Sequence, residues 1–370
     1  MRTGAGRQFA TRRTPRFFRQ RTPPHTRRHD DTVAAVKDRL LRGLAQTVLR
    51  SPLAHVVARS RRRGVDADLD PQVAAVLAAE RLLRLPPLES MAPERARRHA
   101  AAGLAPLEVA PVPMAEIVDT TVAGPAGAIP VRLFVPPDAS PHWIVYFHGG
   151  GGVIGSIRTA EPVTRLLAAQ TRCVVASVEY RLGPEHRHPA AIDDACAAWD
   201  ALVARTGGGR IAVAGDSFGG FLSAHVDHHA LTRGARQPDL QLLIYPVVDM
   251  TRSMPSRERF AENYLLTRGV MQFFDECYLS PGEDRKAVSP MFWPDLRGAA
   301  PAVVATAGYD PLVDEGEAYA ALLRSAGVTV RHRSYRSLIH GFLSLAGGVA
   351  AARAAIDELC GDVRELLGVA

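Results

Sequence analysis

Hydrophobic residues recur at helical spacing in the first part of the chain, up to about residue 108. The clearest segments are TVAAVKDRLLRGLAQTVL (32–49) and DPQVAAVLAAERLLRL (70–85), whose apolar residues fall mainly three and four positions apart. The second segment begins with Asp70, a helix-capping residue type, followed by Pro71, which suits a first helical turn. The pattern predicts an N-terminal helical region over residues 32–108.

From Met114 the pattern becomes strand-like. EIVDTTVAG (116–124) and IPVRLFVPP (129–137) are separated by a Gly/Pro turn, which predicts a hairpin. Six apolar, often β-branched runs then recur, and most are followed by helix-like segments. The runs are HWIVYFHGG, CVVASVEY, RIAVAGDS, LQLLIYPVV, PAVVATAGYD and VTVRHRSY. Such alternation predicts an α/β fold with a mostly parallel central sheet and helices on both faces.

The composition suits one large domain with a smaller addition, since 47% of the 370 residues are hydrophobic. No run approaches the roughly 18 apolar residues of a membrane-spanning helix, and no secretory signal is apparent. We therefore expect a cytoplasmic protein.

The four cysteines are far apart in sequence and lack metal-type spacing, which predicts buried, reduced thiols at Cys173, Cys196, Cys277 and Cys360.

The net charge of +7 is unevenly distributed. Residues 1–63 contain 16 arginines and one lysine but three aspartates, so they carry +14 and the rest of the chain is acidic. Nine of these arginines lie in residues 1–31. This basic leader is typical of a disordered tail or of a start codon assigned too far upstream. The alternative is an arm that binds nucleic acid or anionic lipid, but we expect no nucleic-acid partner.

A serine flanked by glycines carries the first chemical signal. Gly215-Asp216-Ser217-Phe218-Gly219 follows a predicted strand and precedes a predicted helix. This is the context of a G-x-S-x-G nucleophile elbow, which projects the hydroxyl above the sheet and aims the next backbone N–H at the same point. Glycines permit the close backbone approach that such a turn requires. The pattern predicts Ser217 as a nucleophile.

A serine nucleophile needs a histidine to accept its proton and an acid to orient that histidine. In this fold the expected chain order is Ser, acid, His. Asp310 follows an apolar strand and His340 follows the last strand, so both have the expected positions. The alternative for Asp310 is a cap of the next helix, a task that Asp314 or Glu315 would also suit.

Acyl transfer also needs hydrogen-bond donors for the oxyanion. HGGGG (148–152) follows the strand WIVYF and is able to present consecutive backbone N–H groups. Together with the Phe218 N–H group, it predicts a three-donor oxyanion hole.

Two other patterns suggest different chemistry. Gly150, Gly152 and Gly155 spell G-x-G-x-x-G, with Glu179 where a dinucleotide fold places its ribose acid. SIRTAEP is expected to separate the last glycine from the next helix, which argues against dinucleotide binding.

His225 and His229 share a helix face, as two zinc ligands would. The usual third zinc ligand and glutamate base are not evident, so we expect this face to be solvated.

The joint pattern resembles the hormone-sensitive-lipase-like family of α/β hydrolases, which includes bacterial carboxylesterases. The resemblance runs from about residue 70 to the C-terminus. It rests on HGGGGVIGS, EYRLGPEHRHPAAIDD, GDSFGG, NYLLTRGVMQFF, GYDPLVDEGEAYA and SLIHGF. It implies a nucleophile at Ser217, an acid at Asp310, a base at His340, oxyanion donors at Gly150, Gly151 and Phe218, and a loop-bracing role for His148.

The resemblance also implies an α/β-hydrolase fold with an N-terminal helical cap. The expected organisation is a leader (1–31), a cap region (32–108) and a catalytic domain (109–370). The expected activity is hydrolysis of uncharged short- to medium-chain esters without metal or organic cofactor, with a homodimer as the assembly to test. A non-catalytic small-molecule-binding protein on the same fold is the alternative function.

Three positions depart from the family pattern. One of them, Gly183, replaces an alanine in YRLGPEH and is expected to matter little. Phe218 replaces a small residue after the serine, and its ring is expected either to narrow the acyl pocket or to pack behind the helix. Gly152 stands where an aromatic residue often follows the three glycines, which is expected to loosen that loop.

Overall fold

An eight-stranded sheet forms the centre of the computed structural model, which describes residues 43, 47, 49, 51 and 67–369. The strand order is β1-β2-β4-β3-β5-β6-β7-β8. The hairpin of β1 and β2 is antiparallel, β2 pairs antiparallel with β4, and the other pairs are parallel. The strands span Glu116–Gly124 (β1), Gly127–Val135 (β2), Trp143–Phe147 (β3), Val174–Val178 (β4), Ile211–Asp216 (β5), Leu240–Ile244 (β6), Ala302–Tyr309 (β7) and Val330–Ile339 (β8). The predicted hairpin and mostly parallel sheet are confirmed.

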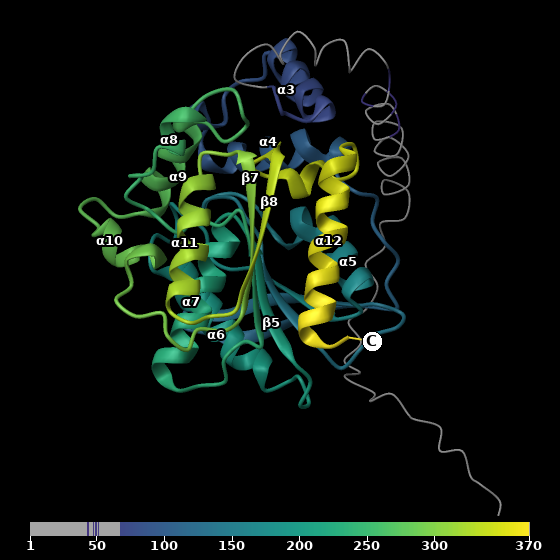
Figure 1. Cartoon of the computed structure of the whole chain (residues 1–370), viewed down its shortest axis with the longest axis vertical. Coiled ribbons are helices and arrows are strands. Elements are labelled where there is room, and N and C mark those ends of the chain that lie inside the picture. Colours follow the sequence, from purple (N-terminus) through teal and green to yellow (C-terminus); the bar gives the residue numbers. More distant parts are fainter. Residues whose placement is uncertain (1–42, 44–46, 48, 50, 52–66, 370) are drawn as a thin grey trace, which may run out of the picture. The chain divides into compact units, whose positions relative to one another are not determined.

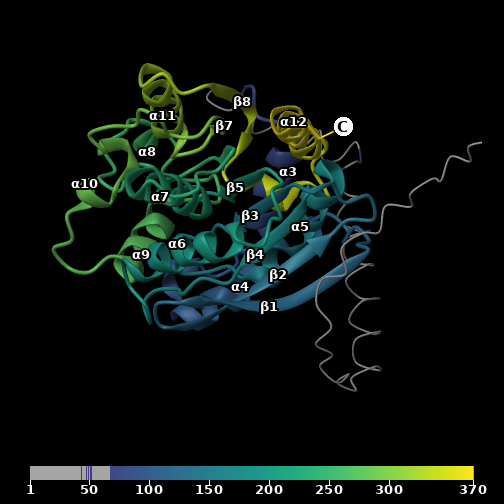
Figure 2. The same cartoon turned by 90° about the horizontal axis from the view of Figure 1, so that it is seen from below.

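Helices cover both faces of the sheet (Figures 1 and 2). Along β3, Ile144 and Tyr146 pack into one core and Val145 and Phe147 into another, as the alternation of side chains along a strand requires. The first core includes the buried faces of α5 (Ile157–Thr171) and α12 (Ala350–Leu367). The helices on the other face of the sheet are α6 (Ala190–Val203), α7 (Phe218–Arg233) and α11 (Val313–Ser325).

Short helices occupy the connections. The segment between β6 and β7 contains three α-helices, α8 (Ser256–Arg259), α9 (Arg268–Tyr278) and α10 (Arg285–Val288), followed by one 3₁₀ helix. The single-turn 3₁₀ helices are η1 (Leu88–Ser90), η2 (Ala105–Leu107), η3 (Pro290–Phe292) and η4 (Phe342–Leu345). The β6–β7 connection leaves the carboxyl end of β6, and this is the end of the sheet where α/β folds place their ligands.

Within residues 67–369, the helices α3 (Pro71–Leu83) and α4 (Pro93–Leu104) precede the sheet. Asp70 caps α3 as predicted, because its Oδ1 accepts hydrogen bonds from the N–H groups of Gln72 (2.8 Å) and Val73 (3.1 Å). The N–H of Asp70 donates to the Ser337 carbonyl oxygen (3.0 Å), which holds α3 near the carboxyl end of β8 (Figure 1). The predicted helical character is therefore confirmed for these two segments.

The predicted leader (1–31) and most of the helical segment 32–49 lie outside the described residues, and the division into three regions stays a prediction. None of the described helices has the length and apolar character needed to cross a membrane. All four cysteines are buried and free, as the sequence indicated.

Candidate active site

Ser217 lies at the sharp turn between β5 and α7. Its φ angle is 53° and its ψ angle is −114°, a conformation with positive φ that is strained for a residue with a side chain. A Cβ atom added to Gly219 would lie 1.9 Å from the Phe147 carbonyl oxygen, and one added to Gly215 would lie 2.2 Å from the Gly219 carbonyl carbon. Both glycines are needed because the backbone of α7 approaches the sheet this closely.

The predicted nucleophile, base and acid form one hydrogen-bonded chain. His340 Nε2 lies 2.9 Å from Ser217 Oγ, and His340 Nδ1 lies 2.8 Å from Asp310 Oδ2. The side chains of all three residues are buried, and Asp310 is fully so. The other carboxylate oxygen, Asp310 Oδ1, accepts the Leu312 N–H at 2.8 Å. Asp310 thus bonds His340 through one carboxylate oxygen and the backbone ahead of α11 through the other, so the two roles expected for it are compatible.

The HGGGG loop follows β3 and lies beside the serine. Asp216 fixes its start, because Oδ1 accepts hydrogen bonds from the Gly149 N–H (2.9 Å) and the Tyr146 hydroxyl (2.6 Å). Burial raises the pKa of Asp216, against the effect of these two donors. Gly151 lines the same pocket as Ser217 and Phe218. The loop is therefore in position to offer backbone N–H groups to a carbonyl oxygen held at Ser217.

His148 packs beneath this loop. Its ring stacks on Tyr180 with 4.4 Å between centroids, and the Tyr180 hydroxyl donates to the His148 carbonyl oxygen at 2.6 Å. His148 Nδ1 lies 2.8 Å from the Gly149 carbonyl oxygen, so this nitrogen carries the proton of the neutral ring. Burial lowers the pKa of His148 to about 4. These contacts support the bracing role proposed for His148.

Arg97, on α4, ties the N-terminal helices to the site. It donates to the carbonyl oxygens of Val153 and Gly183, each at 2.8 Å, and pairs with Glu185 at 2.6 Å. The hydrogen bond from Arg97 lowers the pKa of Glu185 to about 2. Sequence reasoning missed Arg97, because an arginine on an amphipathic helix carries no local signal of such a contact.

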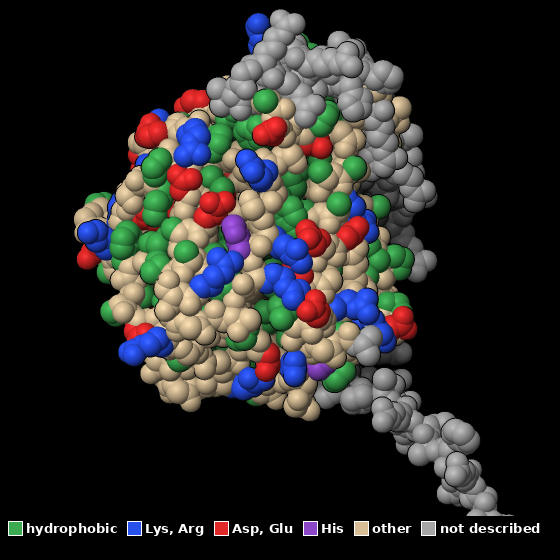
Figure 3. Space-filling view, viewed as in Figure 1, with side chains coloured by type: hydrophobic (Ala, Val, Ile, Leu, Met, Phe, Trp, Pro, Cys, Tyr) green, Lys and Arg blue, Asp and Glu red, His purple; other side chains and the backbone are tan. Residues whose placement is uncertain are grey.

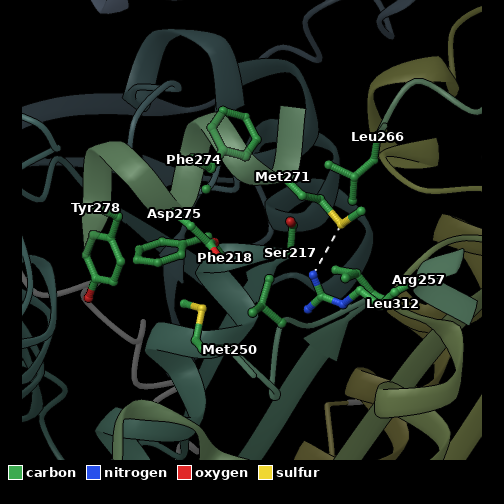
Figure 4. A pocket seen from close by; sticks show the side chains of 12 residues that line it. Ser217, Phe218, Met250, Arg257, Leu266, Met271, Phe274, Asp275, Tyr278 and Leu312 are labelled. Atoms are coloured by element: carbon green, nitrogen blue, oxygen red, sulfur yellow. Dashed lines mark hydrogen bonds between the residues drawn. The ribbon is translucent and has the colours of Figure 1, made fainter. Parts of the chain in front are cut away.

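A mostly apolar pocket opens at Ser217 (Figure 4), and α9 contributes several of its lining residues. The lining residues are Gly151, Ser217, Phe218, Val247, Met250, Arg257, Leu266, Met271, Phe274, Asp275, Tyr278 and Leu312. Arg257 and Met271 were not singled out by sequence reasoning. The pocket is suited to an apolar group attached to the carbonyl that Ser217 would attack.

The departures at Gly152 and Phe218 are linked in space. A Cβ atom on Gly152 would lie 2.8 Å from Phe218 Cζ and 2.9 Å from Tyr278 Cδ2. The Phe218 ring thus occupies the space that a side chain at position 152 would need. It packs edge-on against Tyr278, with 4.7 Å between centroids, and also lines the pocket. The Phe218 ring thus packs against its neighbours and also forms part of the pocket wall, and its effect on acyl-chain length stays a prediction.

Replacing Gly151 by alanine is expected to lower kcat about 10²- to 10³-fold, the effect of losing one oxyanion donor. The added Cβ would lie 2.2 Å from Phe274 Cγ, and the φ of +62° is unfavourable for alanine, so the loop must move. Gly207→Ala is the control, because Gly207 has a similar φ of +59° but nothing within 4 Å of the added atom. Equal steady-state rates for the two variants would contradict a role for the 151 amide.

The structure explains the G-x-G-x-x-G pattern and the acidic residue that follows it without a dinucleotide. Glu179 Oε2 accepts the Ile157 N–H at 2.6 Å, so this carboxylate already occupies the start of α5. One argument against dinucleotide binding was wrong, however, because SIRTAEP does not separate Gly155 from the helix. The helix begins at Ile157 with a capping box between Ser156 and Thr159, which satisfies its first N–H groups despite Pro162 inside the helix.

The predicted histidine face is only partly solvated. His225 Nε2 lies 3.1 Å from the Val288 carbonyl oxygen, and its ring packs edge-on against Trp293. Burial lowers the pKa of His225 to about 3. His229 instead lies 3.2 Å from Asp200. Among the described residues no group of three or more potential ligands comes together to hold a metal ion.

Comparison with known proteins agrees with the fold of this chain. The model of a family described as having the alpha/beta hydrolase fold matches residues 144–344. Carboxylic ester hydrolase LipN of Mycobacterium tuberculosis is 36% identical over 352 residues, covering 88% of this chain and 90% of that protein. Ethyl acetate hydrolase of Pseudomonas putida is 36% identical over 59% of this chain and 72% of its own length.

Solved structures give the same result. LAE6, an α/β hydrolase enzyme from the metagenome of Lake Arreo, matches with a TM-score of 0.78 and 36% identity over 82% of this chain and all of that chain. An esterase of Pyrobaculum calidifontis matches with a TM-score of 0.73 and 36% identity, over 80% of this chain and 99% of its own. The chain belongs to the hormone-sensitive-lipase-like family of α/β hydrolases.

Proposed function

We propose that this carboxylic ester hydrolase uses Ser217 as its nucleophile, His340 as its general base and Asp310 as the acid that orients the base. The observation that carries the proposal is the continuous chain of hydrogen bonds from Ser217 through His340 to Asp310, at 2.9 and 2.8 Å. A non-catalytic binding protein has no need of this alignment.

Catalysis proceeds in two halves. Ser217 Oγ attacks the ester carbonyl while His340 Nε2 accepts the serine proton. The N–H groups of Gly150, Gly151 and Phe218 stabilise the negative oxygen of the tetrahedral intermediate. His340 then donates its proton to the leaving alcohol, and an acyl group remains on Ser217. Water attacks this acyl-enzyme with His340 again as base, releasing the acid and restoring the serine; the sequence of steps uses no metal or organic cofactor.

The substrate class follows from the pocket. Most of its lining residues are apolar, and the aromatic rings of Phe218, Phe274 and Tyr278 restrict its size. Uncharged esters with short to medium acyl chains fit this lining. The test is hydrolysis of p-nitrophenyl esters from acetate to palmitate. Maximal kcat/KM at a short or medium chain supports the proposal, whereas a maximum at palmitate contradicts it.

Phe218→Ala is expected to move this maximum toward longer acyl chains, because the ring lines the pocket and its removal opens space beside Ser217. The same change removes a buried ring, 1% exposed, and should lower the free energy of unfolding by about 3–5 kcal/mol. Phe221→Ala is the matched control, since Phe221 is equally buried but does not line the pocket. An unchanged chain-length profile in Phe218→Ala would assign its ring to packing alone.

Location and partners form the remaining part of the proposal. We propose a cytoplasmic homodimer with a small-molecule ester as substrate and no nucleic-acid partner. Figure 3 shows basic and acidic side chains interspersed on the face that carries α11, β8 and α12, where Arg331 and Arg333 pair with Asp362. A mixed face of this kind lacks the single-sign field that attracts nucleic acid. Light scattering during gel filtration tests the assembly; a monomeric mass contradicts it.

A further inference from the structure

One arginine interrupts the apolar lining of the pocket. Arg257, on α8, is buried and lines the same pocket as Ser217. The other charged lining residue, Asp275, already has strong partners, since its Oδ2 accepts from Arg252 (2.8 Å) and Arg285 (2.5 Å). The pocket therefore contains a cationic group whose own hydrogen bonds need to be accounted for.

The three side-chain nitrogens of Arg257 differ in their hydrogen-bond partners. Nε and Nη2 both lie close to Glu315 Oε2, at 2.9 and 2.8 Å, and Nη2 also donates to the Asp249 carbonyl oxygen at 2.8 Å. Nη1 contacts only the Met271 sulfur, at 3.2 Å, among the residues that the structure describes (Figure 4). A thioether is a weak acceptor. The two N–H groups of Nη1 are thus left without an oxygen acceptor on the pocket side.

The buried carboxylate of Glu315 offsets the positive charge of Arg257. Glu315 is fully buried, and its Oε1 accepts the backbone N–H groups of Val248 (2.9 Å) and Asp249 (3.2 Å). The carboxylate therefore holds the guanidinium in place and offsets its charge. Because the pair is balanced, a ligand at Nη1 need not be anionic, and a neutral oxygen is a sufficient acceptor.

We propose that Arg257 Nη1 binds an acceptor oxygen on the substrate, so that the preferred esters carry a keto, hydroxyl or ether oxygen beyond the reacting carbonyl. This inference rests on the proposed function, since it concerns the substrate of the same site. Arg257 is then a specificity residue: a purely alkyl chain in the pocket would leave its buried N–H groups without an acceptor, at a cost that a matching oxygen removes.

The test compares esters that differ only by a keto group in place of a methylene. One arm places the keto group in the acyl chain, as in p-nitrophenyl 4-oxopentanoate and 5-oxohexanoate against pentanoate and hexanoate. The other arm places it in the alcohol, as in 4-oxopentyl and pentyl acetate. In the parent enzyme, kcat/KM should favour the keto ester about 10- to 100-fold in one arm, the range expected for a hydrogen bond to a charged group. The arm that responds identifies the side of the ester that contacts Arg257.

Arg257→Met should abolish this preference while alkyl esters remain substrates. The double variant Arg257→Met/Glu315→Gln avoids leaving a buried carboxylate without its cation, and should give the same result. The ratio of the two kcat/KM values is the readout, because the folded fraction of each preparation cancels. Arg285→Met is the control: Arg285 pairs with Asp275 but does not line the pocket, so the ratio should stay at the parent value.

The outcomes separate this inference from the proposed function. Equal keto-to-alkyl ratios in the parent and in both Arg257 variants, with alkyl esters hydrolysed by all of them, would overturn the role of Arg257 and leave the esterase assignment intact. So would a parent enzyme that shows no keto preference in either arm. Failure of the folded parent to hydrolyse any ester would instead remove the proposed function.

Discussion

Ser217→Ala is expected to lower kcat for p-nitrophenyl butyrate by about 10⁴- to 10⁶-fold. The substitution removes the oxygen that lies 2.9 Å from His340 Nε2, while the loop and pocket remain. Without this oxygen no acyl-enzyme forms, so only the small acceleration from binding and oxyanion stabilisation remains. Initial rates of p-nitrophenol release, together with a thermal melt to verify folding, provide the measurement.

Ser223→Ala is the matched control for this experiment. Ser223 is a buried serine on the same helix, α7, but its hydroxyl donates to the Gly219 carbonyl oxygen at 2.8 Å. Its replacement should cost about 1 kcal/mol of stability and leave kcat within a few-fold of the parent value. If Ser217→Ala kept more than about a tenth of the parent rate, the nucleophile would lie elsewhere.

Asp310→Asn is expected to lower kcat by about 10⁴-fold with little change in fold. The Leu312 N–H would hold the amide oxygen where Asp310 Oδ1 now lies, leaving the amide nitrogen facing His340 Nδ1. An amide N–H donates, so Nδ1 would become the acceptor and the ring proton would move to Nε2. In that tautomer His340 is unable to accept the proton of Ser217.

Asp314→Asn is the control for Asp310→Asn, because it removes another carboxylate near the start of α11. Asp314 Oδ2 accepts the Ser256 N–H at 2.8 Å, a contact that an asparagine oxygen preserves. We expect its kcat to stay within a few-fold of the parent. Comparison of kcat for the two variants on one ester decides the matter, and a greater loss in Asp314→Asn would move the acid role away from Asp310.

The positions of Ser217, Asp310 and His340 were predictable because the signals in the sequence around each of them are local. The strand, the glycine spacing and the helix that follow one another around Ser217 define its turn, and each constraint lies within a few residues of the serine. Asp310 and His340 each follow a strand whose carboxyl end must lie at the same edge of a parallel sheet. Their mutual distances then follow from the strand order β5-β6-β7-β8.

The surroundings of the site were less predictable because their contacts join distant parts of the chain. The hydrogen bond of Arg97 to Val153 spans 56 residues, and that of Arg257 to Glu315 spans 58. The Phe218 ring fills the space beside Gly152 only because the HGGGG loop lies against the start of α7. Such contacts depend on tertiary packing, and neither an isolated arginine nor an isolated glycine indicates its partner.

The error at SIRTAEP has a related origin. Pro162 and the polar residues before it are unfavourable for a helix, yet α5 begins at Ile157. The decisive contributions are the capping box and the carboxylate of Glu179, which accepts the Ile157 N–H from the end of a neighbouring strand. The capping box was visible in the sequence, whereas the Glu179 contact required the fold.

The central claim, that Ser217 forms the acyl-enzyme, is tested most directly by covalent labelling. The purified chain and Ser217→Ala are incubated with diethyl p-nitrophenyl phosphate, whose phosphoryl group stays on the attacking oxygen when p-nitrophenol leaves. Intact mass spectrometry should find one adduct per chain in the parent, located on Ser217 by peptide mapping, and none in Ser217→Ala. An adduct on another residue, or equal labelling of both proteins, would contradict the account.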